Sequence, residues 1–188
     1  MDTIDRIKDL VMRANPLFAV SVVVLPVSAL IYALTFGSTT ALNYVHVMTG
    51  VLWTGIDIFM GLVLGPVLGG MDVDERADVF ERLVPKMTFL MPTLAAVTIT
   101  AGVELAQRIG VFSLSNHWIL AALVIATALS VQGFGVILPN EIRVYLELSS
   151  EKPNKDKISR LGMRNAKLGG VQGALQIGIV FVMANLAF

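Results

Sequence analysis

Five long runs of apolar residues follow one another along the chain, and polar stretches separate them. A helix needs about 20 predominantly apolar residues to cross the hydrocarbon core of a bilayer, and each run is close to that length or longer. The runs cover approximately residues 17–36, 41–70, 87–107, 117–138 and 169–188. The pattern predicts an all-α, polytopic membrane bundle of five transmembrane helices within residues 16–188.

Residues 1–15 have a different pattern, in which charged and apolar side chains recur at helical spacing. Ile4, Ile7 and Val11 fall on one face of a helix, while the charged residues fall on the other faces. The pattern predicts an amphipathic helix that lies on the membrane surface, separate from the transmembrane domain. A solvated polar tail is the alternative interpretation of the same residues.

Two polar connections carry most of the charged residues. Residues 72–86 form a charged segment with helical periodicity after the second run, and residues 149–167 are predicted to form a basic loop. The fourth helix is expected to leave the membrane near Pro139 and to continue in polar form through Leu148.

Small residues recur every fourth position in two of the runs, which favours close packing against a neighbouring helix or a second subunit. The positions are Gly61, Gly65 and Gly69 in the second run, and Gly170, Ala174 and Gly178 in the fifth.

Composition agrees with a membrane protein, since 55% of the 188 residues are hydrophobic and only 15% are charged, against about a quarter charged in an ordinary soluble domain. The formal net charge of zero argues against nucleic acid as a partner. The chain has no cysteine, which excludes disulfides, thiolate-bound iron–sulfur clusters and covalently attached c-type haem.

The basic residues predict the orientation of the bundle. If the N-terminus lies inside, thirteen of the fourteen Lys and Arg residues fall on the inner side, and Arg108 alone falls outside. Because basic residues concentrate in inner loops, we expect a multi-pass protein of the cell membrane with its N-terminus in and its C-terminus out.

A polar stripe follows one face of the second predicted helix, where residues advance by about 100° each. Its members are His46, Gly50, Trp53, Asp57 and Gly61. An ionisable side chain inside a membrane is costly, so His46 and Asp57 are functional candidates. Asp57 is a candidate proton-transfer group, and we expect it to be protonated or paired with a polar side chain such as Gln132.

Four candidates should lie at similar depth near the outer surface: His46, Glu104, Arg108 and His117. The two histidines, on neighbouring helices, would ligate the iron of a b-type haem. Gly50 and Trp53 would then contact the porphyrin, and Arg108 would pair with a propionate. The alternative is a copper or zinc ion bound directly by His46, His117 and Glu104.

The same residues also have structural interpretations. His117 fits an aromatic belt at the membrane interface. Glu104 has Arg108 four residues later, at the spacing of a helical ion pair. Asp57 and His46 would then only form hydrogen bonds to neighbouring helices.

The second run opens with the motif His46-x6-Trp53-x-Gly55, and the third ends with Gly102 and Glu104. These motifs, within residues 41–145, resemble the copper-resistance protein D (CopD) group and the HemJ group of haem-binding membrane proteins. The resemblance implies that His46 is a ligand position and that the chain handles haem or copper. The lysine that HemJ-like proteins have early in the next span has no counterpart here.

Together these features predict a membrane-bound b-type haem protein that takes part in electron transfer, as an oxidoreductase component. It would act with a quinol or as a subunit of a redox complex, and its glycine faces would contact other subunits or a second copy. The alternatives are a copper-handling protein of the CopD type and a structural subunit of a membrane complex.

Overall fold

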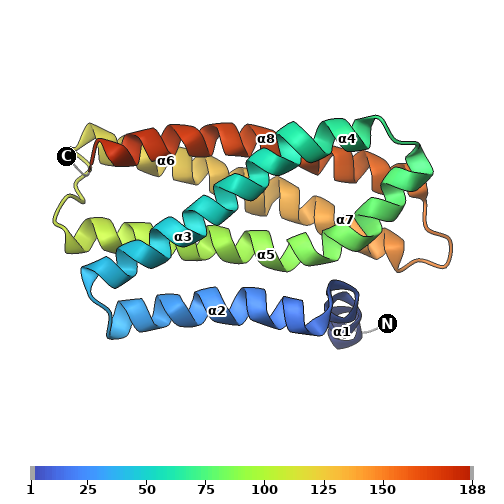
Figure 1. Cartoon of the computed structure of the whole chain (residues 1–188), viewed down its shortest axis with the longest axis horizontal. Helices are drawn as coiled ribbons and strands as arrows, with labels where there is room; N and C mark the ends of the chain where they lie inside the picture. The colour runs from blue at the N-terminus through green and yellow to red at the C-terminus, as the bar shows by residue number, and fades with distance from the viewer. Residues whose placement is uncertain (1–2, 187–188) are drawn as a thin grey trace.

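The computed structural model describes residues 3–186, and helices account for most of them (Figure 1). The elements are α1 (Thr3–Ala14), α2 (Pro16–Thr35), α3 (Thr39–Ile58), η1 (Phe59–Leu64), α4 (Gly65–Gly69), α5 (Val73–Arg108), α6 (His117–Gln132), η2 (Gly133–Ile137), α7 (Leu138–Leu148) and α8 (Lys155–Ala184). The segments η1 and η2 are π-helical, and each joins its two neighbouring α-helices into one continuous rod.

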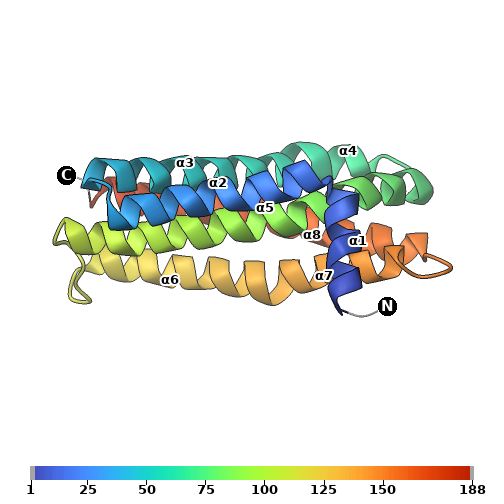
Figure 2. The same ribbon diagram turned by 90° about the horizontal axis from the view of Figure 1, so that it is seen from below.

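Five rods among the described residues are long and apolar enough to cross a membrane: α2, α3–α4, α5, α6–α7 and α8. Most of them run along the long axis of the molecule (Figures 1 and 2), and α3 crosses this direction obliquely in Figure 1. Large apolar side chains such as Leu25, Leu62 and Phe181 are exposed on the outside of the bundle. The predicted all-α bundle of five membrane-spanning helices is therefore confirmed.

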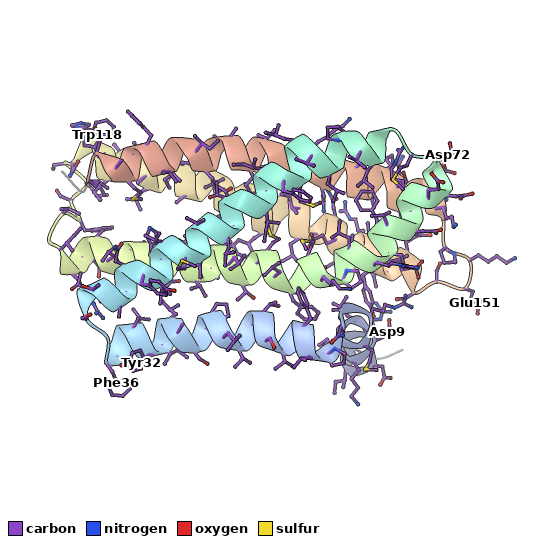
Figure 3. The ribbon with its side chains drawn as sticks, in the orientation of Figure 1. Asp9, Tyr32, Phe36, Asp72, Trp118 and Glu151 are labelled. Carbon is purple, nitrogen blue, oxygen red and sulfur yellow. The ribbon has the colours of Figure 1, made fainter. Side chains whose placement is uncertain are left out.

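The two ends of the bundle can be followed in Figure 3, where Asp72 and Glu151 lie at one end and Phe36 and Trp118 at the other. Helix α1 lies across the bundle axis, nearer the end with Asp72 and Glu151 (Figure 2). We call this end the α1 end and the opposite end the far end. The helix predicted at the N-terminus is therefore formed, and its place on a membrane surface stays a prediction.

The bend between α1 and α2 occurs at Asn15, whose backbone has a φ of 72°. The Asn15 side-chain oxygen accepts a hydrogen bond from the backbone N–H of Leu17, and Pro16 begins α2 at a position that needs no N–H donor. Tyr145 of α7 holds α1 against the bundle through a hydrogen bond, in which its hydroxyl donates to the Arg6 carbonyl oxygen over 2.7 Å. The crosswise position of α1 is thus fixed at both of its ends.

The polar connections are more helical than the sequence predicts. Residues 72–86 belong to the long helix α5, and α8 already begins at Lys155, so the predicted basic loop over 149–167 is wrong beyond residue 154. Both segments have an apolar face that packs into one buried cluster at the α1 end, which includes Phe80, Val144 and Ile158. Burial of that face stabilises both segments as helices. In the sequence their many charged residues make them look like solvent-exposed connections.

Each π-helical segment is followed within two residues by a proline, Pro66 after η1 and Pro139 after η2. A proline has no N–H to donate and its ring collides with the preceding turn, and a wider π turn relieves that collision. The helices therefore continue through both prolines, and Pro139 does not end the fourth rod.

Of the small residues in the two repeats, Gly61 of the second run and Gly170 of the fifth contact each other. A Cβ atom placed on Gly61 would lie 2.2 Å from Cα of Gly170, so the two backbones touch where α8 crosses η1. Gly69 and Gly178, by contrast, have no described neighbour within 4 Å of such an atom. Close packing thus depends on the Gly61–Gly170 pair rather than on the whole repeat.

Candidate cofactor site

A cavity of about 750 Å³ lies in the far half of the bundle, between α3, α5, α6 and α8. This volume falls within the range of about 300–1,000 Å³ that is usual for ligand pockets. Most of its lining is apolar, and the main polar exceptions are His46, Thr39, Asn43, Thr54, Thr98 and Gln176. The cavity is large enough to bind a flat, hydrophobic cofactor.

His46 is held against α5 by a hydrogen bond of 2.9 Å between its Nδ1 atom and the carbonyl oxygen of Thr98. A carbonyl oxygen only accepts, so Nδ1 carries the proton, and Nε2 keeps the lone pair that a metal ion needs. In most metal sites, a hydrogen bond of this kind from the ring nitrogen that does not bind the metal fixes the orientation of the ligating histidine. His46 is therefore oriented as a ligand would be.

Gly102 makes room for this histidine. A Cβ atom on Gly102 would lie 2.7 Å from Cε1 and 3.0 Å from Nδ1 of the His46 ring. Below the ring, the Thr98 hydroxyl donates to Oγ1 of Thr49 over 2.9 Å, and Thr49 donates to the Val45 carbonyl over 2.8 Å. The position of His46 thus depends on a close approach of α3 and α5 and on a short polar network.

Asp57 lies on the side of the cavity that faces the α1 end, and its side chain is buried, with 3% exposed. Its Oδ2 atom accepts a hydrogen bond of 3.0 Å from Nε2 of Gln176, and the Trp53 indole lies close to the same carboxyl group. The expectation of a polar partner is confirmed, but naming Gln132 as an example was wrong. Gln132 instead donates to the carbonyl oxygen of Leu168 over 2.7 Å.

Arg108 closes the C-terminal end of α2. Its Nη1 donates to the Gly37 carbonyl oxygen over 3.1 Å, and its Nη2 donates to that of Leu34 over 2.8 Å. Its Nε pairs with Oε1 of Glu104 at 2.9 Å, which confirms the ion pair expected from their spacing. Since these groups use the guanidinium donors and Arg108 does not line the described cavity, the residue serves to join α2 to α5.

His117 begins α6 and is exposed, and its ring centroid lies 5.0 Å from that of Trp118. Of the two histidines, only His46 lines the large cavity as far as the described residues show. Within residues 3–186, no three His, Asp or Glu side chains gather closely enough to hold a metal ion. The structure therefore does not unite His46, His117 and Glu104 in one direct metal site.

Glu141 of α7 is a candidate that the sequence analysis missed. It is 5% exposed, faces the same side of α7 as the buried residues Val144 and Tyr145, and lies near the Thr88 hydroxyl. It lines a smaller cavity of about 60 Å³ together with Asp57 and Gln172. Apolar residues three, four and seven positions later place Glu141 on the apolar face of a helix, and this spacing was the available signal. The sequence analysis instead took the segment to be a polar part of the helix outside the membrane.

Comparisons with models of protein families, with curated proteins and with solved structures gave no match for this chain.

Proposed function

We propose that this chain is an integral protein of the cell membrane that binds b-type haem in the large cavity, where His46 would hold the iron. The observation that carries the proposal is the hydrogen bond from Nδ1 of His46 to the Thr98 carbonyl oxygen beside a largely apolar cavity of about 750 Å³. The resemblance of the His46 motif to haem-binding membrane proteins agrees with this choice of ligand.

The lining of the cavity fits the two kinds of surface that haem has. Apolar walls and the small residues Gly50 and Gly102 suit the porphyrin face, and the Trp53 indole closes the deep side. Thr39 and Asn43, near the first turn of α3, would hold the propionates, since free backbone N–H groups at a helix N-terminus favour anions. Arg108 has no part in this arrangement.

Bound haem would supply one-electron redox chemistry. The chain would orient the ligand through Thr98, exclude water with apolar walls, and leave His46 as the one histidine ligand. His117 is not among the described residues that line the cavity and would not hold the iron. Electron transfer with a quinol or with a partner subunit is the role that best fits such a site in a membrane bundle.

The test is the visible absorption spectrum and haem content of the purified protein, compared between His46→Ala and His117→Ala. These are chemically identical changes, so they form a matched pair. We expect a Soret band in the unaltered protein, its loss in His46→Ala, and its retention in His117→Ala. Equal loss in both variants would instead favour a site shared by two histidines. Bound copper without haem would favour the copper-handling alternative.

A further inference from the structure

A second cavity separates two buried carboxyl groups. It has a volume of about 60 Å³ and lies between Asp57 of α3 and Glu141 of α7, with Gln172 of α8 in its wall. Residues of η2 also line it, and Met60 of η1 does so on the opposite side. One water needs about 10–15 Å³ of such space, so several waters fit between the two carboxyl groups.

An unpartnered oxygen marks a place that suits a water molecule. Oε1 of Gln172 is buried and has no hydrogen-bond partner within the described part of the chain, and the same holds for Oε1 of Gln176. A buried amide oxygen without a partner is destabilising, so buried polar groups are normally satisfied by protein or by ordered water. Gln172 lines the small cavity, where a water molecule would satisfy it.

The two carboxyl groups have opposite surroundings. Asp57 accepts a hydrogen bond from the Gln176 amide, which suits an ionised carboxylate. Near Glu141, the Thr88 hydroxyl donates its one proton to the Val84 carbonyl oxygen over 2.9 Å, so its oxygen is free to accept from a protonated Glu141. An acceptor suits a protonated carboxyl. The described lining of the cavity includes no lysine or arginine that would neutralise two negative charges.

Asp57 is also close to the large cavity. Trp53 lines both cavities, and Gln176 lines the large one while it donates to Asp57. Glu141 lies on the other side, on the rod segment that leads to the α1 end. The carboxyl groups are therefore arranged in sequence along the bundle axis, between the α1 end and the large cavity.

We propose that Asp57 and Glu141 are a proton-transfer pair, joined by water that Gln172 positions, which passes protons between the α1 end and the large cavity. In each transfer the O–H bond of Glu141 breaks, a water relays the proton, and an O–H bond forms on Asp57. Asp57 then releases its proton toward the large cavity, Glu141 regains a proton from the α1 end, and no electron moves. The pair does not depend on which molecule occupies the large cavity.

Infrared spectroscopy of the purified protein in lipid nanodiscs tests the pair itself. We expect a C=O stretch of a protonated carboxylic acid, which Glu141→Gln removes and Asp57→Asn shifts by removing the neighbouring charge. The Asp57→Asn variant should fold, because the asparagine oxygen still accepts from Gln176. A carboxylic acid band that neither substitution alters, or the absence of any such band, would overturn the proposal.

The role of Gln172 is tested by transfer into D₂O. Gln172→Met keeps the side-chain volume but removes the amide that binds water, and Gln132→Met makes the same change outside both cavities. The carboxylic acid band should exchange at least about tenfold more slowly in Gln172→Met, equivalent to losing one hydrogen bond to the relay water. Gln172→Asn retains the amide, so exchange of the band should be slowed less in this variant. It replaces Gln172→Met in the experiment if the methionine variant does not fold. Equal exchange in all these proteins and the unaltered chain would contradict the proposed path.

Discussion

Gly102 decides whether His46 can keep its position, because its missing side chain is the space that the imidazole occupies. A methyl group there would approach Cε1 of His46 to 2.7 Å. We expect Gly102→Ala to displace the ring, weaken its hydrogen bond to Thr98, and lower the haem content of the purified protein. Gly178→Ala is the control, since no described atom lies within 4 Å of the added methyl group. Equal haem content in both variants would count against the proposed ligand geometry.

At the scale of single elements, the attachment of α1 depends on Tyr145. The Tyr145 hydroxyl donates to the Arg6 carbonyl oxygen and lies 3.1 Å from Oδ2 of Asp9. Tyr145→Phe should cost about 1 kcal/mol of docking free energy and increase backbone hydrogen exchange throughout α1. Tyr44→Phe, which removes a hydroxyl from an exposed side chain of α3, should leave the exchange of α1 unchanged.

The same attachment should depend on pH. Burial disfavours the charged form of Asp9, but hydrogen bonds from Arg13 and Tyr145 outweigh it, and the pKa of Asp9 lies below its ordinary value of 3.8. A lowered pKa stabilises the docked helix at pH values above 3.8, and this contribution is lost as the pH falls through the lowered pKa. Hydrogen exchange in α1 should therefore rise only below that ordinary value. A rise near neutral pH would show that another group controls the docking.

The crossing of α8 over η1 tests a second element-scale feature. Gly61→Ala would place a methyl group 2.2 Å from Cα of Gly170, and a backbone atom cannot move aside as a flexible side chain does. We expect a loss of about 1–3 kcal/mol in the free energy of unfolding, as is typical of overpacking. Thermal unfolding in detergent measures it. Gly69→Ala, at an open position of the same rod, is the matched control and should unfold near the unaltered protein.

For the whole molecule, the uneven distribution of basic residues predicts the orientation in the membrane. Cysteines introduced at Ser38 and Ser113, in the two loops at the far end, should react with an impermeant thiol reagent added to intact cells. A cysteine at Ser150, in the loop before α8, should react only after permeabilisation. The chain has no cysteine of its own to interfere. Labelling at Ser150 in intact cells would reverse the proposed orientation.

The sequence predicts the five spans well because their apolar length is a local property. It also identifies the stripe of His46, Trp53 and Asp57, since helical periodicity places these residues on one face without knowledge of the neighbours. It does not predict that Gln176 rather than Gln132 contacts Asp57, because that choice depends on how the helices are rotated about their axes.

Other features depend on packing between distant segments. Arg108 binds carbonyl groups more than seventy positions earlier in the chain, and nothing near it in the sequence indicates this contact. Glu141 is buried because the apolar faces of α7, α8 and the start of α5 meet at the α1 end. In the sequence these segments look charged and solvent-exposed. The spacing of Glu141 from later apolar residues indicates a buried face, but it does not show which distant segments cover that face.

The central claim, that His46 supplies an iron ligand inside the large cavity, is tested most directly by ligand replacement. In His46→Gly, removal of the imidazole leaves a gap beside Gly102 that free imidazole can enter. We expect haem binding and the absorption spectrum to be lost in this variant and restored by added imidazole, while His117→Gly retains the original spectrum without it. A spectrum that His46→Gly leaves unchanged, or one that imidazole does not restore although haem is supplied, would contradict the account.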